Sequence, residues 1–422
     1  MPQRQPHARY SEPATSAAGI PAREWPIFRR RLLAWFQRTK RDLPWRRSTG
    51  AGCTGSPRRK MGAGPPSVLA DSPPSKSKAG RGGATQTKQD PYRIWLSEIM
   101  LQQTRVAAAI PYYRRFLKRF PTVRHLAQAR PAAVLEAWAG LGYYSRARNL
   151  HRAARKILTR HGGKFPDDWD AVLALPGIGR YTAAAVLSIA CDQPLAVLDG
   201  NVARVLARLG ALRGDLHRPP AWKRLQTAAG ALLARRAPGD WNQAMMELGA
   251  TVCTPRAPRC PQCPVARWCR AQALGLAERL PVARRKPRTV KITVAAAVLL
   301  DPRGRTLLVR HANGDGAIFS RLWQFPAVEA GRRARAALSG HLLSITRHSP
   351  VLNRAALNAA MKPLPPARHT VTFRDIQLVP FLLRVRHLPS LAGARTARLG
   401  ALGRLATSSA TRKIAAAALR AI

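Results

Sequence analysis

The chain has 422 residues, of which 46% are hydrophobic, so it holds enough apolar material for more than one folded domain. Lysine and arginine number 72 against 20 aspartates and glutamates, and the resulting net charge of +52 favours a polyanionic partner such as nucleic acid. Part of this excess can instead reflect a basic composition common to the host's proteins. No apolar run is long enough to span a bilayer, and the N-terminus has no apolar signal segment, which argues against a membrane or secreted protein.

Residues 1–24 are rich in proline, alanine and arginine and are predicted to form a disordered tail. The apolar spacing from Trp25 to Arg38 predicts an amphipathic helix, which ends before the segment Leu43-Pro44-Trp45-Arg46. Residues 48–89 are rich in glycine, serine, proline and basic residues without apolar periodicity. We therefore predict a disordered insert there.

A helix is predicted to follow this insert, with Asp90 as its N-cap and Pro91 at its first position. Ile94, Glu98 and Leu101 stand at positions i, i+4 and i+7 and therefore share one face. Because that face is otherwise apolar, Glu98 is expected to point inward. Lost hydration would raise its pKa and make it a candidate general acid, whereas a glutamate on a solvated helix edge is the alternative.

The pattern remains helical from residue 90 to about residue 273, interrupted by prolines and glycines, and it predicts an all-α domain. Within it, Leu-Pro-Gly-Ile-Gly-Arg at residues 175–180 predicts a tight hairpin between two helices. Gly177 and Gly179 would let backbone N–H groups approach a phosphate beside Arg180, at the N-terminus of the next helix. An ordinary helix–helix turn is an equally good interpretation of this motif alone.

Asp199 and Asn201 lie in Val-Leu-Asp-Gly-Asn-Val, just before an amphipathic helix that either residue can cap. A carboxylate at a helix N-terminus is expected to stay ionised, because the helix dipole and N–H groups favour the anion. We therefore expect Glu98 and Asp199 to have pKa values pushed apart. One neutral acid with one anion is the pair needed to break a glycosidic bond.

Four of the six cysteines follow the spacing C-x6-C-x2-C-x5-C, at Cys253, Cys260, Cys263 and Cys269. Four thiolates in one short loop predict tetrahedral zinc or an iron–sulfur cluster, and the spacing alone does not distinguish these. Cys53 and Cys191 stand outside the loop. Clustered cysteines of this kind are typical of a reducing compartment.

The periodicity changes after a basic, proline-containing linker at residues 281–290. Residues 290–300 and 306–310 are strand-like and flank the turn Asp301-Pro302-Arg303-Gly304, and residues 371–386 give further strand signal. The sequence therefore predicts a second domain of mixed α and β structure at residues 291–422.

Five motifs occur in a fixed order along the chain. They are Ser-Glu-Ile-Met-Leu-Gln-Gln-Thr at 97–104, Gly-Leu-Gly-Tyr-Tyr-Ser-Arg-Ala-Arg-Asn at 140–149, the hairpin at 175–180, Val-Leu-Asp-Gly-Asn-Val at 197–202, and the four-cysteine loop. Together they closely resemble the MutY adenine DNA glycosylases of the helix-hairpin-helix superfamily. The resemblance implies an all-α helix-hairpin-helix glycosylase domain at 25–280 with an iron–sulfur loop at 253–269, followed by an α+β Nudix-like domain that recognises the lesion.

This resemblance also implies an activity, which is the removal of adenine mispaired with 8-oxoguanine or guanine in double-stranded DNA. The adenine must leave the base stack to reach the catalytic carboxylates. By matching motifs, Glu98 protonates the adenine, and Asp199 stabilises the sugar oxocarbenium ion or bonds to it transiently. Asn201 orients Asp199 or water, and Glu247 is a supporting carboxylate of the pocket.

Other roles follow from the same motifs. Gln103 and Tyr143 look like wedges that enter the duplex, while Gly177, Gly179 and Arg180 would bind a phosphate. The four cysteines of the loop would hold a [4Fe–4S] cluster, as in the family.

Position 181 separates this family from its endonuclease III relatives, which carry a lysine there for Schiff-base attack on the sugar. Here the residue is Tyr181, which joins the expected active-site residues, so we expect a monofunctional glycosylase. The first alternative is an endonuclease III-like glycosylase and lyase that acts on damaged pyrimidines. The second is a non-catalytic DNA-binding iron–sulfur protein.

The C-terminal domain resembles a Nudix fold without the Nudix box, which favours lesion reading over nucleotide hydrolysis. The family's Phe-Ser-His turn matches Arg-His-Thr-Val-Thr-Phe at residues 368–373, so His369 and Thr372 are candidate DNA contacts, or else plain strand residues. Val371 and Phe373 depart from the family pattern, and we expect weaker discrimination of 8-oxoguanine from guanine. The composition and the lack of a targeting segment favour a bacterial cytoplasm, with association to the nucleoid through DNA, and we expect a monomer.

Overall fold

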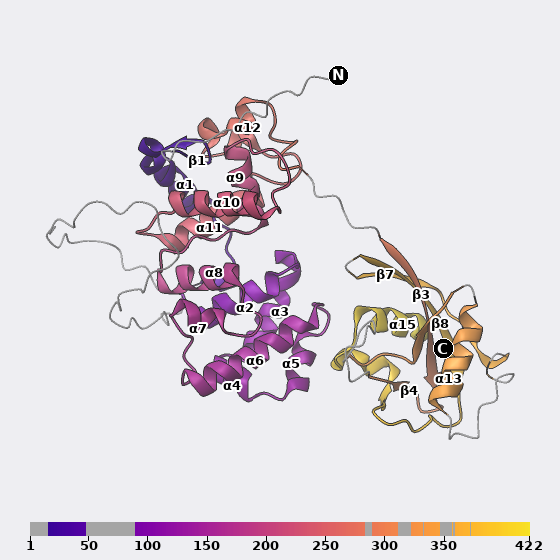
Figure 1. Cartoon of the computed structure of the whole chain (residues 1–422). Coiled ribbons are helices and arrows are strands. Elements are labelled where there is room, and N and C mark those ends of the chain that lie inside the picture. Colours follow the sequence, from indigo (N-terminus) through magenta and orange to yellow (C-terminus); the bar gives the residue numbers. More distant parts are fainter. Residues whose placement is uncertain are drawn as a thin grey trace, which may run out of the picture. The chain divides into compact units, whose positions relative to one another are not determined.

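The computed structural model describes residues 16–47, 89–282, 289–310, 322–331, 333–346, 357, 359–371 and 373–422. The chain divides into two compact units, each described here by itself. The first unit comprises Met1–Gln103, Thr122–Arg124 and Arg152–Arg284, and the second comprises Thr104–Pro121, His125–His151 and Arg285–Ile422. Figure 1 shows the elements in sequence colours.

The chain is helical from Trp25 to Ala273 in its described parts. The helices are α1 (Trp25–Thr39), α2 (Pro91–Leu101), α3 (Val106–Arg119), α4 (Val123–Gln128), α5 (Pro131–Trp138), α6 (Tyr144–Arg160), α7 (Trp169–Leu173), α8 (Arg180–Cys191), α9 (Gly200–Leu209), α10 (Pro219–Leu232), α11 (Pro238–Thr251) and α12 (Arg270–Ala273). Short 3-10 turns are η1 (Ala22–Glu24), η2 (Pro44–Arg46), η3 (Cys260–Gln262) and η4 (Ala266–Trp268). The helical structure predicted for this region is confirmed, although the two units do not divide at residue 280, because Thr104–Pro121 and His125–His151 group with the C-terminal residues.

The segment before α1 is ordered in its described part. β1 (Ser16–Ala17) pairs with β2 (Ile20–Pro21), and Ile20 is fully buried in the core of the first unit. The indole of Trp25 donates a hydrogen bond to the carbonyl of Ile20 at 2.9 Å. The prediction of a disordered tail is therefore wrong for residues 16–24, because an apolar side chain anchors them. Residues 1–15 and residues 48–88 of the predicted insert lie outside the described residues.

Helix α2 begins as predicted, since the Asp90 carboxylate accepts a hydrogen bond from the N–H of Tyr92 at 2.9 Å and Pro91 opens the helix. The helix is buried on nearly every side and packs on α8. Trp95 is fully buried and lies 5.5 Å from Phe165, measured between ring centroids. Glu98 is thus carried by a helix whose position is fixed by packing on several sides.

Helices α9 and α11 also pack closely in the first unit. Gly249 of α11 allows this approach, because a Cβ added there would lie 2.7 Å from the Cβ of Asn201 and 3.0 Å from its carbonyl oxygen. Helix α1 covers α11 from another side, where Phe28 lies 5.9 Å from Trp241 between ring centroids. The start of α9, which carries Asp199 and Asn201, is therefore held against α11.

The second unit contains α3, α5 and a mixed β-sheet. The sheet is formed by β3 (Val290–Leu300), β4 (Arg305–Leu308), β5 (Ala327–Glu329), β6 (Lys362–Pro363), β7 (Ala367–Val371), β8 (Arg374–Arg384) and β9 (Arg395–Arg398). Its path is β6-β8-β3-β4-β9, with β5 on β3 and β7 on β8. The long strands β3 and β8 are parallel, from the pair Val290–Arg374 to the pair Leu300–Arg384.

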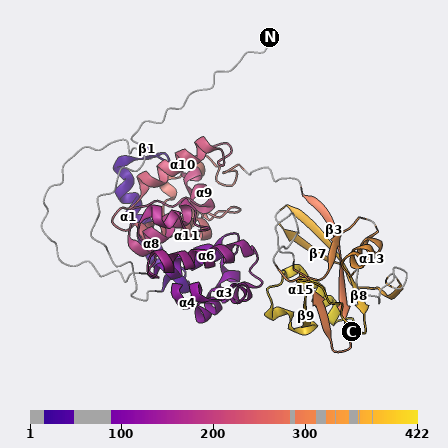
Figure 2. The ribbon, with the colours of Figure 1, turned by 60° about the horizontal axis from the view of Figure 1, so that its bottom comes forward.

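Two helices cover the two faces of this sheet (Figure 2). Ala296 and Val298 of β3 pack in one core with α15 (Ser409–Leu419), whereas Ala295 and Ala297 pack in another core with α13 (Ala334–Ile345). The alternation follows from the strand period of two. The short η5 turn (Leu399–Arg404) precedes α15. The predicted C-terminal domain of mixed α and β structure is confirmed.

No helix in the described ranges is both long enough and apolar enough to cross a bilayer.

The contact at Gly249 leads to a stability prediction. The Gly249→Ala substitution places a methyl group against Asn201, and we expect overpacking to lower the free energy of unfolding by about 1–3 kcal/mol. Gly230→Ala in α10 is the matched control, since nothing lies within 4 Å of an added Cβ, and we expect about 0.5–1 kcal/mol of stabilisation. Denaturant unfolding measures both; equal effects would show that the α9–α11 contact is not tight.

Candidate active site

Two carboxyl groups far apart in sequence, those of Glu98 and Asp199, interact electrostatically in the interior of the first unit. Glu98 is only 8% exposed, and its Oε2 accepts a hydrogen bond from the Tyr181 hydroxyl at 2.8 Å. Burial is the largest influence and raises the pKa of Glu98 to about 7. The charge of Asp199 raises this pKa further, whereas the Tyr181 hydrogen bond and the charge of Arg46 lower it. Glu98 can therefore hold a proton near neutral pH.

Asp199 is the N-cap of α9, as the sequence allowed. Its carboxylate accepts a hydrogen bond from the N–H of Val202 at 2.7 Å and another from the Asn201 amide at 3.1 Å. These bonds and the charge of Arg204 lower its pKa, but burial is the larger influence and the pKa of Asp199 is raised. The expectation that the two pKa values move in opposite directions is therefore wrong: both are raised, because the site withdraws both groups from water.

The Asp199 carboxylate is connected to the cysteine loop through two side chains. Arg204 donates to the Asn201 carbonyl oxygen Oδ1 at 2.9 Å, and Asn201 in turn donates to Asp199. The same arginine donates to the backbone carbonyls of Gly249 at 2.7 Å and Cys253 at 2.9 Å. The orientation of Asn201, and through it of Asp199, is thus fixed from both α11 and the loop.

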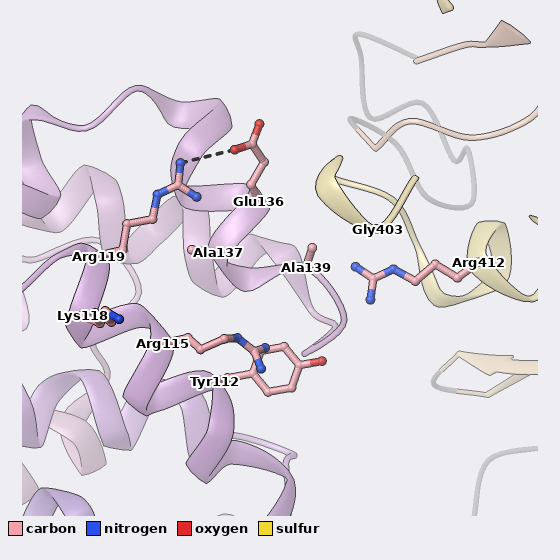
Figure 3. Close-up of a pocket in the computed structure, with 9 residues that line it drawn as sticks. All are labelled: Tyr112, Arg115, Lys118, Arg119, Glu136, Ala137, Ala139, Gly403 and Arg412. Atoms are coloured by element: carbon pink, nitrogen blue, oxygen red, sulfur yellow. Dashed lines mark hydrogen bonds and ion pairs between the residues drawn. The ribbon is translucent and has the colours of Figure 1, made fainter. Parts of the chain in front are cut away.

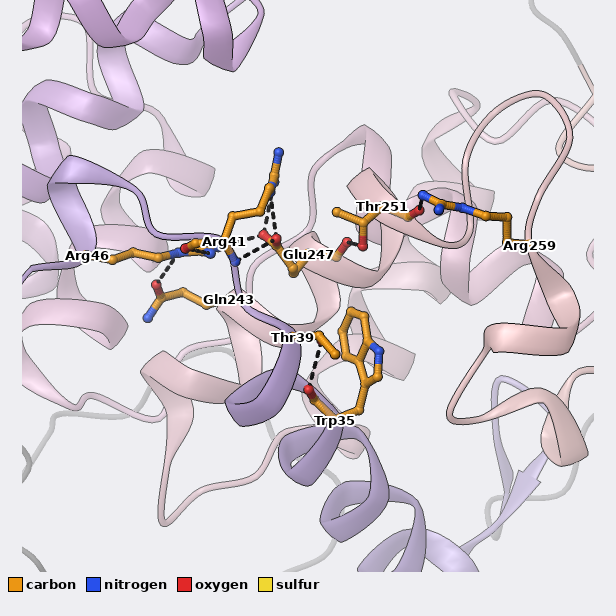
Figure 4. A network of polar contacts seen from close by, with 8 residues as sticks. All are labelled: Trp35, Thr39, Arg41, Arg46, Gln243, Glu247, Thr251 and Arg259. Carbon is orange, nitrogen blue, oxygen red and sulfur yellow. Dashed lines mark hydrogen bonds and ion pairs between the residues drawn. The ribbon is translucent and has the colours of Figure 1, made fainter.

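Glu247 occupies a different electrostatic environment (Figure 4). Its side chain is 1% exposed and pairs with Arg41 at 2.6 Å and with Arg46 at 2.8 Å. Burial alone would raise the pKa of Glu247, but the two guanidinium groups together outweigh it, and the pKa is lowered. Arg46 also donates to Gln243 at 3.1 Å. Glu247 is thus an ionised, fully paired carboxylate.

Arg41 and Arg46 are site residues that the sequence analysis missed. Arg41 precedes the η2 turn and Arg46 is its last residue. The sequence predicts this segment only as the end of the first helix, and no local pattern indicates which acid the two arginines pair with. Both line a cavity of about 210 Å³ together with Gln243. The positive charge of Arg46 lowers the pKa of Glu98, so this turn influences the protonation of the active-site carboxyl group.

The hairpin at residues 175–180 joins α7 to α8 as predicted. Gly177 has a φ of +79°, a left-handed conformation that favours glycine. Gly179 caps α8 without a side chain, and no atom lies within 4 Å of a Cβ placed there. The Arg180 guanidinium lies over the Trp169 ring at 5.6 Å. The N-terminus of α8 is therefore open to an approaching anion.

The two predicted wedges share an unusual backbone conformation. Gln103, exposed just after α2, has a φ of +55°, and Tyr143, just before α6, has a φ of +48°. Residues with side chains seldom adopt this region, and such strain concentrates at functional sites. The Tyr143 ring is 44% exposed, which leaves an aromatic surface open to a ligand.

The four cysteines of the loop are partly buried and influence one another electrostatically. Burial, rather than the neighbouring thiols, is the main reason that the pKa of Cys263 rises to about 12. The fully buried Arg208 donates to the Cys253 sulfur at 3.2 Å and to the Thr254 carbonyl at 2.7 Å. Within the described ranges, no three His, Cys, Asp or Glu side chains are arranged to hold a single metal ion. The donor set nevertheless fits a thiolate-bound centre, because a buried cation accompanies it.

In the C-terminal sheet, His369 lies on β7, and burial together with the charge of Lys413 lowers its pKa. Thr372 lies outside the described residues. The neighbouring Phe373 is exposed at the turn between β7 and β8, and Arg374 lies over its ring at 5.7 Å. The strand signal at residues 371–386 therefore includes this turn.

A basic cavity of about 660 Å³ lies in the second unit (Figure 3). Its lining residues are Tyr112, Arg115, Lys118, Arg119, Glu136, Ala137, Ala139, Gly403 and Arg412. Arg119 pairs with Glu136 at 3.3 Å, which leaves a clear excess of positive charge around the cavity. Such a surface suits an anion, although it is distinct from the acidic pair.

Comparisons with known proteins concern mainly the helical part of the chain. Residues 96–227 match the family described as HhH-GPD superfamily base excision DNA repair protein. The rat adenine DNA glycosylase is 42% identical over 245 residues, which cover 58% of this chain and 41% of the rat protein. The human adenine DNA glycosylase is 43% identical over 250 residues, which cover 59% of this chain and 40% of the human protein. The Arabidopsis thaliana adenine DNA glycosylase is 32% identical over 346 residues, which cover 74% of this chain and 49% of that protein.

Among solved structures, a thermostable thymine-DNA glycosylase is similar with a TM-score of 0.46 and 24% identity, covering 60% of this chain and 98% of that chain. A non-covalent endonuclease III–DNA complex is similar with a TM-score of 0.40 and 22% identity, and the match covers 44% of this chain and 86% of that chain.

Residues 96–227 thus carry the helix-hairpin-helix fold of this superfamily. Within that superfamily the relatives named above are adenine DNA glycosylases, and the resemblance to the MutY family drawn from the motifs is confirmed. The chain spans about half the length, or less, of these curated relatives.

The raised pKa of Glu98 leads to a prediction about stability and pH. A carboxyl whose pKa rises from 4.5 to about 7 on folding destabilises the folded state above pH 7 by about 3 kcal/mol, and this cost disappears as the pH falls below the unfolded value. We therefore expect Glu98→Gln to raise the melting temperature more at pH 8 than at pH 5. Glu136→Gln, at the surface ion pair with Arg119, is the control; equal changes at both pH values would contradict the buried, protonated state of Glu98.

Proposed function

We propose that this protein removes adenine from mispairs with 8-oxoguanine or guanine in double-stranded DNA. The observation that carries the proposal is the buried pair of Glu98, bound to Tyr181, and Asp199, capping α9. Both are influenced by burial, yet they have different partners: a single hydroxyl for Glu98, and two N–H donors for Asp199. This asymmetry supports different roles for the two carboxyl groups.

In the proposed reaction, protonated Glu98 gives its proton to a ring nitrogen of the extruded adenine. The bond between C1′ of the sugar and the base then breaks, and its electron pair leaves with the adenine. Asp199, whose anionic form is favoured by the donors Val202 and Asn201, stabilises the positive charge on the sugar or bonds to it transiently. Water adds to C1′ and releases a proton to a carboxylate, which restores the site.

Glu247 has a supporting role in this proposal. Its negative charge is already offset by Arg41 and Arg46, so it is unsuited to donating a proton. We infer that it holds the two guanidinium groups in place beside the pocket. Arg46 then contributes a positive charge that limits how far the pKa of Glu98 rises.

The proposed enzyme is monofunctional. The residue that follows the hairpin is Tyr181, whose hydroxyl donates to Glu98 at 2.8 Å and also lies 3.3 Å from the Met246 sulfur. It offers no amine for attack on the sugar. The amine of Lys156, which is an alternative nucleophile by residue type, donates to the Ala174 carbonyl at 2.8 Å. An endonuclease III-like lyase is therefore the less favoured function.

Duplex DNA is the proposed partner, supported by the net charge of +52, the open N-terminus of α8 and the basic cavity of Figure 3. On this proposal Gln103 and Tyr143 enter the duplex, while Gly177, Gly179 and Arg180 bind a phosphate. His369 and Thr372 remain candidate contacts to the opposite base. We further propose a monomer that acts in the cytoplasm on nucleoid DNA.

The proposed cofactor is a [4Fe–4S] cluster on Cys253, Cys260, Cys263 and Cys269. When bound, the cluster supplies a covalent core to a loop that has little regular structure, and it can accept or give an electron. Arg208 would offset the negative charge of the thiolates from inside the protein. Arg204 would hold the loop to Asn201.

A glycosylase assay tests the proposed activity. Duplexes with adenine opposite 8-oxoguanine or guanine should yield free adenine, and their strands should break only after alkali. Glu98→Gln should slow release by about a thousandfold, the scale of lost acid catalysis, while DNA binding persists. Glu329→Gln, at an exposed residue of β5 outside the basic cavity, should behave as wild type. Strand scission without alkali would support the lyase instead, and no release from any adenine mispair would refute the proposal.

Metal analysis tests the cofactor. The purified protein should contain about four iron atoms per chain, and Cys260→Ser should lower that content together with the visible absorbance. Cys191→Ser, outside the loop, should retain the iron. Zinc at about one atom per chain, with no iron, would show that the site is a zinc site.

A further inference from the structure

The turn that carries Tyr143 is held in an unusual backbone shape. Gly140, Gly142 and Tyr143 all have positive φ angles, of +102°, +76° and +48° respectively. Glycine adopts this region freely, but tyrosine does not, so the surrounding structure must hold Tyr143 there. The ring meanwhile remains 44% exposed. An exposed aromatic ring on a constrained turn needs a support beneath it.

Arg146, on the first turn of α6, occupies that position. It is 8% exposed, and its guanidinium carbon lies 5.3 Å from the centre of the Tyr143 ring and 5.5 Å from that of Trp138. Trp138 is fully buried and donates its indole N–H to the Gly142 carbonyl at 3.0 Å. The guanidinium thus lies against one fixed ring and one exposed ring.

The same guanidinium binds the backbone of the turn. It donates to the carbonyls of Leu141 at 3.3 Å and Gly142 at 3.2 Å. It also donates to the Thr104 hydroxyl from two nitrogens, at 3.3 Å and 3.2 Å. Thr104 directly follows Gln103, the other residue with a strained backbone and a proposed place in the duplex. The Arg146 side chain therefore contacts both the turn that carries Tyr143 and Thr104, the residue that follows Gln103.

We propose that Arg146 is a positioning residue that holds the Tyr143 wedge and couples it to the segment after Gln103. The proposal rests on the proposed function, because it assigns both wedges to DNA. A planar guanidinium suits this role since it can face two rings while donating along its edges to oxygens in the same plane. A lysine would retain the charge but would lose the planar surface and most of the donors.

The role predicts a specific defect. Without the guanidinium, Tyr143 is free to leave its left-handed conformation. Its ring then no longer occupies the space that the opened base pair leaves in the duplex. Binding to fully paired DNA, which depends mainly on phosphate contacts, should change little. The loss should therefore appear in the preference for a mispair over a matched duplex, rather than in overall affinity.

The test measures Kd for a duplex containing an adenine–8-oxoguanine mispair and for its matched counterpart, at one salt concentration. All variants carry Glu98→Gln so that the substrate is not consumed. We expect Arg146→Lys and Arg146→Met each to weaken mispair binding by about tenfold and matched-duplex binding by no more than about twofold. Arg155→Met, a change on the exposed part of α6, is the control and should leave both unchanged.

A double-mutant cycle separates positioning from general destabilisation. If Arg146 acts through the wedge, Arg146→Lys should add no further loss in a Tyr143→Ala protein. Additive losses, or an Arg146→Lys protein that retains the mispair preference, would overturn the proposal. If the protein with native Glu98 and Arg146 releases no adenine from any duplex, the proposed function is wrong. If that protein releases adenine but the Arg146 predictions fail, only the positioning role is wrong.

Discussion

The burial of the Glu98 carboxyl group is the constraint on which the site depends. Helix α2 is buried on nearly all sides, so its glutamate is only 8% exposed, and its hydrogen-bond partner is the Tyr181 hydroxyl of the adjoining α8. A carboxylate in that position is costly, and the protein avoids the cost by raising the pKa to about 7. The same packing that stabilises the fold thus sets the protonation state that acid catalysis requires.

Three carboxyl groups of the first unit show how partners, rather than burial alone, decide charge. Glu98 has a neutral hydroxyl, Asp199 has an N–H group and an amide, and Glu247 has two guanidinium groups. Accordingly, the pKa values of Glu98 and Asp199 are raised, whereas the pKa of Glu247 is lowered. Only the full positive charge of arginine outweighs desolvation here.

The rest of the unit holds these groups in register. Gly249 lets α11 approach the start of α9, and Arg204 joins Asn201 to the backbone at both Gly249 and Cys253. The cysteine loop is therefore mechanically connected to the residue that orients Asp199. Gln103 and Tyr143 are among the residues with a left-handed backbone conformation, and both are exposed, so each can present a rigid shape to a ligand.

Sequence alone determined what depends on neighbours along the chain: the cap and first turn of α2, the inward face of Glu98, the hairpin at Gly177, the grouped cysteines and the two long strands. Only the tertiary structure decided which charges meet, since Glu247 and Arg41 are 206 positions apart and no local pattern links them. For the same reason the raised pKa of Asp199 was not foreseeable from its helix cap. A cap is a local hydrogen bond, whereas desolvation is imposed by every element that packs around the group.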